Sequence, residues 1–303
     1  MLRYLGRLVL KTLLFLSFLL QLFVHQANAG LIPNSWMESL VLIEVQKKGN
    51  FEPLGTGFMI GSKGYKVLVT NAHILHSNTD LPLFIRVNKR DPKPSEAMFD
   101  RIKIFPMVDP QLKPIFHKKA DLAVLYVLIP NDFDLKSVKI GEIDESSFLQ
   151  QKDVPLGDEV LLIGFPTSIG EIKTIEKEMN IPVIRGGVVS AKFRRNDHEL
   201  LLIDAPSYWG NSGGPVILRP SLYNVEKESS GNPPPKSQTQ PKLIGIVSEM
   251  FAVGMEWEVA PQKPFNDSKL EKQKVGSIWH SGLSVVVPTD YLTELLNTLP
   301  KVK

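Results

Sequence analysis

The sequence predicts an all-β fold of two antiparallel barrels, each with about six strands, followed by a C-terminal helix. Short runs rich in apolar and β-branched residues follow one another along the chain, and clusters of Gly, Pro, Asn and Asp separate them. These runs fall into two groups on either side of the polar segment 131–157. Such grouping is typical of two sheets rather than of an alternating α/β chain.

The first group is expected to form an N-terminal barrel over roughly residues 38–130. Its strands are predicted at Leu40–Val45, Gly57–Ile60, Lys66–Thr70, Phe84–Val87, Ile102–Phe105 and Leu122–Leu128. The second group is expected to form a C-terminal barrel over roughly residues 155–288. Its strands are predicted at Glu159–Phe165, Pro182–Ser190, Glu199–Asp204, Pro215–Leu218, Leu243–Val247 and Leu283–Val287.

The last element is a predicted helix over 288–299. Pro288 and Thr289 stand at its start, and acidic residues lie in its first turns, where the helix dipole favours negative charge. Four leucines share one face at helical spacing, which indicates that this face packs on a core: Leu292, Leu295, Leu296 and Leu299.

Two polar segments, Pro220–Gln240 and Pro261–Lys274, interrupt the second group. The first includes three consecutive prolines and is rich in Ser, Lys, Gln and Glu, a composition that cannot bury a core. We expect both to be solvated surface excursions, and gating of substrate access is the alternative.

The first 29 residues have the layout of a secretory signal peptide. Arg3, Arg7 and Lys11 precede the apolar run 13–24, and an Ala-Asn-Ala sequence ends at Ala29. We expect cleavage after Ala29, which leaves 30–303 as an exported domain in the periplasm or outside the cell. Retention of the segment as a membrane anchor is the alternative, although the run is short for a span of about 20 residues.

Charge and cysteine content exclude several function classes. The chain has 35 Lys and Arg against 32 Asp and Glu, and three of the basic residues lie in the signal segment, so the mature part is electrically balanced. A nucleic-acid partner is not indicated, because no basic excess remains. The absence of cysteine excludes disulfides, thiolate metal sites and a cysteine nucleophile. The composition leaves the oligomeric state open.

The segment Trp209–Pro215 (WGNSGGP) is the strongest chemical motif in the chain. Glycines around Ser212 allow a tight turn whose backbone can approach a substrate without Cβ clashes. The amides of Gly210 and Ser212 are candidate donors to a developing oxyanion. Because a strand is predicted directly after the turn, the serine would sit on a rigid support.

A serine nucleophile needs a base, and His73 is the candidate. It follows the predicted strand Lys66–Thr70, at the point where a barrel can present a side chain into a cleft. Asp121 is the candidate orienting acid, because it directly precedes an apolar strand, where a carboxylate needs a partner. The remaining histidines are dispersed and form no H-E-x-x-H metal motif: His25, His76, His117, His198 and His280.

Three sequence blocks together resemble the chymotrypsin-like serine peptidases, and most of all their bacterial HtrA-like branch. The blocks are Thr70–His73 (TNAH), Ala120–Leu125 (ADLAVL) and Gly210–Pro215 (GNSGGP), and their order is that of the family. The resemblance extends from Gly55 to Leu299. It implies a double-barrel serine endopeptidase acting on protein or peptide substrates, with His73, Asp121 and Ser212 as its triad and without a cofactor or metal.

The resemblance also defines expectations for regulation and specificity. We expect the domain to work without a PDZ domain, and without trypsin-type activation cleavage because Asn211 replaces the usual aspartate. The substrate pocket is expected to involve Tyr208, Trp209, Val247, Ser248 and Glu249, with a preference for small or medium apolar P1 residues. A non-catalytic or latent binding or chaperone-like module on the same fold is the alternative function.

Overall fold

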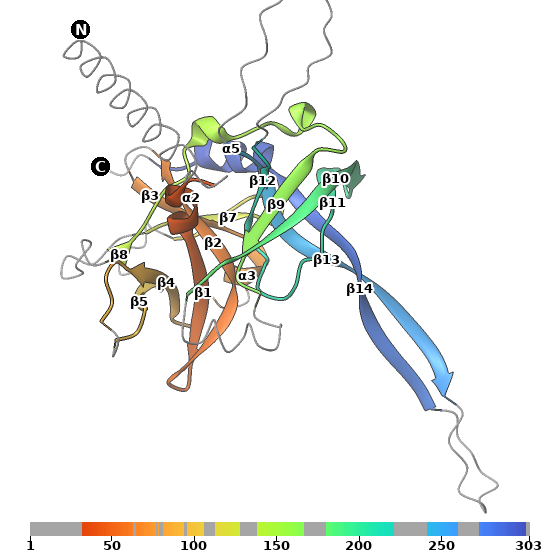
Figure 1. Ribbon diagram of the computed structural model, residues 1–303, viewed down its shortest axis with the longest axis horizontal. Helices are drawn as coiled ribbons and strands as arrows, with labels where there is room; N and C mark the ends of the chain where they lie inside the picture. The colour runs from red at the N-terminus through yellow and green to blue at the C-terminus, as the bar shows by residue number, and fades with distance from the viewer. Residues whose placement is uncertain are drawn as a thin grey trace, which may run out of the picture.

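The computed structural model describes residues 32–62, 65–76, 78, 81–93, 96–105, 113–127, 138–166, 180–220, 241–259 and 273–300. In these ranges the chain forms two antiparallel sheets and a C-terminal helix, α5 (Thr289–Asn297), as Figure 1 shows. The all-β prediction is therefore confirmed. The expected signal peptide at 1–29 and most of both polar excursions, 221–240 and 261–272, lie outside the described residues.

The N-terminal sheet has eight strands in the order β5-β4-β1-β2-β3-β7-β6, and β8 pairs with β4. Short helices α2 (Asn34–Ser39) and α3 (Ala72–His76) precede β1 and follow β3. The strands are β1 (Leu40–Lys47), β2 (Asn50–Ser62), β3 (Tyr65–Thr70), β4 (Leu83–Lys89), β5 (Phe99–Phe105), β6 (Ile115–Phe116), β7 (Ala123–Tyr126) and β8 (Val138–Lys139). This sheet has two strands more than the six that were predicted for the N-terminal barrel. The additional strands, β6 and β8, have two residues each and come from segments with no apolar alternation, so the sequence pattern did not indicate them.

The C-terminal sheet closes into a six-stranded barrel in the order β10-β11-β14-β13-β12-β9, as predicted. Its strands are β9 (Glu159–Gly164), β10 (Val183–Arg195), β11 (His198–Asp204), β12 (Pro215–Leu218), β13 (Lys242–Val259) and β14 (Gln273–Pro288). The tight turn between β10 and β11 places Asn196 and Asp197 at positive φ, which these two residue types tolerate better than most.

Strands β13 and β14 continue well beyond the predicted ends, Val247 and Leu283. Their backbones stay paired out to Val259 and Gln273, and the resulting ribbon projects from the body of the molecule (Figure 1). The prediction stopped early because apolar residues become interspersed with Glu and Gly, which obscures a strand pattern although the main chains still pair. Part of the predicted excursion 261–274 thus belongs to β14.

One apolar cluster joins both sheets to α5. It includes Phe58 and Val69 of the first sheet, Val285 of the barrel, and the helix residues Leu292 and Leu296. The predicted leucine face of the helix is confirmed, since its three leucines are buried and so is Leu299, which lies just beyond the observed end of the helix at Asn297. A second cluster fills the N-terminal lobe and a third fills the barrel. The shared cluster fixes the two lobes against each other, and the candidate site residues come from both.

The segment between the lobes also bonds to each of them. Ile143 N–H donates to Met59 O at 2.9 Å in the first sheet, and Leu149 N–H donates to Leu243 O at 2.8 Å in the barrel. Two single turns of 3-10 helix lie in this segment, at Glu145–Ser147 and Gln151–Asp153.

Candidate active site

Strand pairing in the N-terminal sheet brings His73 and Asp121 together. β3 and β7 are antiparallel neighbours, and Thr70 at the end of β3 lies opposite Ala123 at the start of β7. His73 lies three residues beyond Thr70 in α3, and Asp121 lies two residues before Ala123. Residues 48 positions apart in sequence therefore meet because the register of one ladder places them side by side.

The Asp121 carboxylate holds His73 by two hydrogen bonds. Its Oδ2 lies 2.8 Å from His73 Nδ1, and its Oδ1 accepts the His73 backbone N–H at 3.0 Å. An ionised carboxylate can only accept, so the bond assigns the proton to Nδ1 and leaves Nε2 free to take another. Asn71 Nδ2 donates to the Asp121 carbonyl at 2.9 Å and fixes the backbone of the acid as well.

Burial alone would raise the pKa of Asp121, because a charged carboxylate loses hydration there. The hydrogen bonds and positive charge of His73, together with a bond from Ser248, outweigh this effect and hold the pKa below its usual value. These donors therefore favour the ionised form of Asp121.

Ser212 approaches this pair from the second lobe. Its Oγ donates to the Ser248 carbonyl at 3.3 Å, and Ser248 Oγ in turn donates to Asp121 Oδ2 at 2.7 Å. Gly55 also separates the histidine helix from the serine turn, since a Cβ on Gly55 would lie 2.5 Å from Ile74 Cδ1 and 3.0 Å from Ser212 O. The three predicted site residues are thus neighbours, linked through Ser248.

No hydrogen bond among the described residues joins the His73 ring to Ser212 Oγ. A bond between nucleophile and base is commonly long or misaligned until substrate binds. The Ser212 hydroxyl donates instead to the backbone carbonyl of Ser248. A rotation about the Ser212 Cα–Cβ bond would release this hydrogen bond and turn the hydroxyl toward another acceptor.

The turn around Ser212 leaves two amides free for an anion. Among the described residues, Asn211 N–H donates to Tyr208 O and Gly213 N–H donates to Val247 O, whereas the Gly210 and Ser212 amides have no acceptor. Gly213 has φ +85°, and a Cβ there would lie 2.0 Å from Thr56 O. Any residue other than glycine would therefore displace the turn.

Thr56 is a residue that sequence reasoning missed. It is fully buried in β2, and its Oγ1 donates to Gly210 O at 2.7 Å and accepts from Phe165 N at 2.9 Å. Its N–H donates to Ser212 O at 2.8 Å, and its carbonyl accepts Thr70 Oγ1 at 2.8 Å. Every polar group of Thr56 thus joins the nucleophile turn to a strand or a strand end. The glycines on either side of it, inside an apolar strand, were the available signal.

The residues expected to line a substrate pocket take different positions. Val247 packs in the barrel core, so only its backbone faces the nucleophile turn. Ser248 is buried and bonds to Asp121. Glu249 is exposed, and Arg195 holds its two oxygens at 2.6 and 3.0 Å. The Arg185 guanidinium lies over the Tyr208 ring at 4.5 Å, and Trp209 is 73% exposed.

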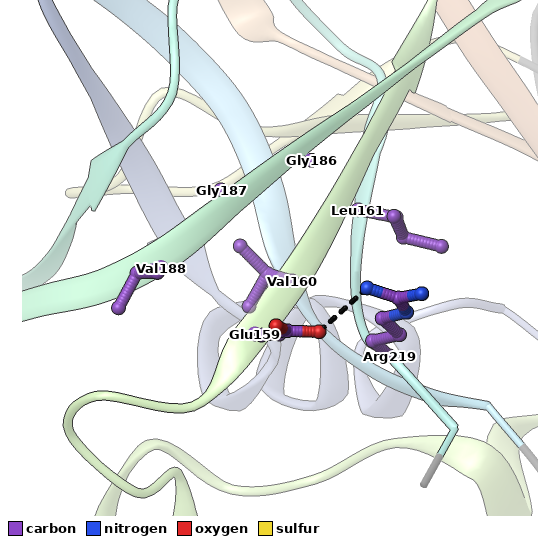
Figure 2. Close-up of a pocket in the computed structure, with 7 residues that line it drawn as sticks. All are labelled: Glu159, Val160, Leu161, Gly186, Gly187, Val188 and Arg219. Atoms are coloured by element: carbon purple, nitrogen blue, oxygen red, sulfur yellow. Dashed lines mark hydrogen bonds and ion pairs between the residues drawn. The ribbon is translucent and has the colours of Figure 1, made fainter.

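A cavity of about 270 Å³ lies elsewhere on the barrel, between β9, β10 and the end of β12 (Figure 2). An ion pair between Arg219 Nη1 and Glu159 Oε2, 2.7 Å long, crosses it, and apolar groups of Val160, Leu161 and Val188 line the rest. None of the predicted site residues lines this cavity.

Within the described part of the chain, no three His, Asp or Glu side chains lie together as a metal ion would require. No helix in the described ranges is long and apolar enough to cross a membrane.

Comparison with known proteins identifies the family. The model of the trypsin-like peptidase domain matches residues 55–220, more than half of the chain. The chain belongs to the trypsin-like peptidase family. The matched range includes His73, Asp121 and Ser212, and it contains the Thr56 side chain that joins the two lobes.

Individual relatives of this peptidase domain are distant. The curated "Putative protease Do-like 12, mitochondrial" of Arabidopsis thaliana is 29% identical over 192 residues, which is 58% of this chain and 31% of that protein. The chain thus spans about a third of the length of that relative.

Two solved protease structures are also similar. "HtrA-type protease AlgW with decapeptide" is 16% identical, with a TM-score of 0.49, over 88% of this chain and 65% of that chain. A serine endoprotease from Yersinia pestis is 18% identical, with a TM-score of 0.45, over 88% of this chain and 64% of that chain.

The bonds of Thr56 lead to a stability prediction. Thr56→Val keeps the shape of the side chain but leaves the Gly210 carbonyl and the Phe165 N–H without a partner in a buried place. We expect the free energy of unfolding, measured by urea denaturation, to fall by about 1–3 kcal/mol. Thr56→Ser keeps the hydroxyl and serves as the matched control, with a smaller loss. Equal stability of the Val and Ser variants would contradict a stabilising role for the Thr56 hydroxyl.

Proposed function

We propose that this chain is a serine endopeptidase that cleaves protein or peptide substrates through an acyl-enzyme. The main support is the chain of contacts from His73 through Asp121 and Ser248 to Ser212, which joins a base, its orienting acid and a nucleophile across the two lobes. Membership of the trypsin-like peptidase family supports the same reaction. The chemistry needs no cofactor, because each proton moves between side chains and substrate.

In the proposed reaction, Ser212 Oγ attacks a peptide carbonyl carbon while His73 Nε2 accepts the serine proton. Asp121 stabilises the resulting imidazolium, and its lowered pKa keeps it ionised as it does so. The free amides of Gly210 and Ser212 hold the oxyanion of the tetrahedral intermediate. His73 then protonates the leaving amine as the peptide C–N bond breaks, which leaves the acyl-enzyme. Water attacks the acyl carbonyl while His73 accepts a proton from it, and His73 returns that proton to Ser212 Oγ as the acid product leaves.

The first test removes the nucleophile. Ser212→Ala should lower kcat against a denatured protein substrate by about 10⁴-fold or more, because base and acid cannot act without it. It should also abolish covalent labelling by a fluorophosphonate, which reacts only with an activated serine. Ser190→Ala, an exposed serine of the same barrel, is the matched control and should label like the wild type. Wild-type turnover by the Ser212→Ala protein would refute the proposed nucleophile.

One observation favours a second candidate function, a latent or non-catalytic module. The hydroxyl of Ser212 donates to the Ser248 carbonyl, and no bond to His73 is formed. A module of this kind would bind polypeptide segments without cleaving them. The wild-type protein would then bind an unfolded substrate yet fail to react with the fluorophosphonate, an outcome that the first proposal does not allow.

The ion pair between Glu249 and Arg195 argues against a preference for basic P1 residues. Glu249 is the acidic residue among those expected to line the substrate pocket, where it could attract a basic P1 side chain. Arg195 already neutralises its carboxylate through a bidentate pair. The wild type should therefore cleave a peptide library after small or medium apolar residues.

The Arg195 pairing can be tested directly. Arg195→Ala frees the Glu249 carboxylate, so we expect the share of cleavage after Lys or Arg to rise about three- to tenfold, as one exposed ion pair allows. Arg194→Ala, a neighbouring exposed arginine, is the matched control and should leave the profile unchanged. A wild-type profile dominated by Lys and Arg would contradict the proposed preference.

We also propose that the domain is exported after cleavage behind Ala29. The support is the sequence of the first 29 residues, with its basic start, apolar run and Ala-Asn-Ala ending. The Arabidopsis relative is named as mitochondrial, and an organelle is therefore the competing destination.

N-terminal sequencing of the mature protein should read Gly30 first, in an exported fraction. Ala29→Arg should block processing, because a large charged residue does not fit the small-residue cleavage site. Processing at an unrelated position, or a mature protein that still carries residues 1–29, would contradict export by cleavage.

A further inference from the structure

The turn that carries Asp121 is closed by a histidine to which the proposed reaction assigns no role. His117 begins this turn, its side chain is only 9% exposed, and its backbone N–H donates to Leu122 O at 2.9 Å. Leu122 N–H donates to Ala120 O at 2.8 Å inside the same loop. Asp121 is therefore enclosed by a short hydrogen-bonded loop that starts at His117 and ends at Leu122.

The ring of His117 completes this loop through one nitrogen. His117 Nδ1 accepts the backbone N–H of Ala120 at 2.9 Å and that of Lys119 at 3.2 Å. A nitrogen that faces two donors cannot itself carry a proton, so the ring is the neutral tautomer with its proton on Nε2. These two bonds satisfy backbone donors immediately before Asp121 that have no other partner among the described residues.

The other ring nitrogen of His117 connects the turn to the C-terminal helix. Nε2 lies 3.1 Å from Glu294 Oε2 and donates to it, and the His117 ring meets Tyr291 edge to face at 5.1 Å. Tyr291 is tied to the barrel, since its hydroxyl accepts the Glu199 N–H at 2.8 Å. The orientation of the His117 ring is thus set by α5, which packs against both lobes.

We propose that His117 is a positioning residue for Asp121, and that it acts through the acceptor Nδ1 rather than through its contact with Glu294. This inference rests on the proposed function, in which Asp121 orients His73. The bond to the Ala120 amide should matter more than the contact with Glu294, because the two partners differ in burial. Glu294 is 65% exposed and can bond to water instead, whereas Ala120 is buried.

Displacement of the Asp121 carboxylate would weaken its support of the His73 ring. A displaced Asp121 carboxylate supports the His73 imidazolium less well, so the pKa of His73 falls and the acid limb of the pH profile moves to lower pH. The other charged or titratable groups near this turn include Glu294 from α5, the exposed Lys118 and Lys119 of the turn itself, and His76 of α3, whose ring stacks on Phe116 at 3.8 Å. None of them changes in the variants that test Nδ1.

Two substitutions separate the two ring nitrogens. In His117→Asn, the side-chain oxygen takes the position of Nδ1 and can accept hydrogen bonds from the same two backbone N–H groups, but the shorter side chain cannot reach Glu294. The amide nitrogen of His117→Gln can reach Glu294, but this variant offers no acceptor at the place of Nδ1. Glu294→Gln removes the charge of the partner and leaves the His117 ring in place.

We expect His117→Gln to lower kcat against a peptide substrate by about 10- to 100-fold with little change in KM, because Asp121 and His73 lose alignment. The acid limb of the kcat profile, and the NMR titration of isotope-labelled His73 assigned with His73→Ala, should both move to lower pH. His117→Asn and Glu294→Gln should stay within about threefold of the wild type in kcat. A role confined to stability would lower the melting temperature without moving the His73 titration.

Three outcomes would overturn the inference. The first is a wild-type kcat and His73 pKa in His117→Gln, the second an equal loss in His117→Asn, and the third an equal loss in Glu294→Gln. The NMR spectrum of the wild type adds a test that needs no variant to fold, since His117 must show the tautomer with its proton on Nε2. The histidine titration needs no turnover, so it stays informative even if fluorophosphonate labelling refutes the peptidase itself.

Discussion

The carboxylate of Asp121 is the interaction on which the candidate site depends. It accepts hydrogen bonds from His73 of the first lobe and from Ser248 of the second, and it is the one side chain of the proposed triad that bonds to both. Burial alone would favour its protonated form, so Asp121 stays ionised only because these donors outweigh the lost hydration of its carboxylate. The two lobes must be held in a fixed relation for the same carboxylate to serve both.

That relation comes from apolar packing together with a small number of buried bonds. The cluster shared by both sheets and α5 fixes the lobes, and Thr56 then positions the nucleophile turn within that frame. The turn itself tolerates no side chain at Gly213, because the backbone of Thr56 occupies that space. Close packing against the first lobe, and not the turn alone, therefore shapes the loop that carries Ser212.

The C-terminal helix extends this frame toward the acid. Its leucine face is buried in the shared cluster, while Tyr291 and Glu294 on its other sides reach the barrel and the His117 ring. Tyr126 Oη also donates to Pro300 O at 2.6 Å just beyond the helix. A helix packed between the lobes in this way links the stability of the fold to the geometry around Asp121.

The sequence by itself determined the features that depend on local spacing. Alternation placed eight of the twelve predicted strands within three residues of their observed bounds, and glycine spacing around Ser212 indicated a tight turn with free amides. The blocks around His73 and Asp121 predicted residues that the structure does bring together. The short strands β6 and β8 and the long ends of β13 and β14 carried too weak a pattern to predict.

Only the tertiary structure decided which polar groups support those residues. Thr56 bonds to a carbonyl 154 positions away, Ser248 bonds to an acid 127 positions away, and His117 bonds to a helix residue 177 positions away. No periodicity or motif encodes such pairs, because each depends on how two lobes pack after their strands have formed. Strands and turns can be predicted because they depend on residues that are close in sequence. Hydrogen bonds between distant side chains depend on which groups the folded chain brings close together.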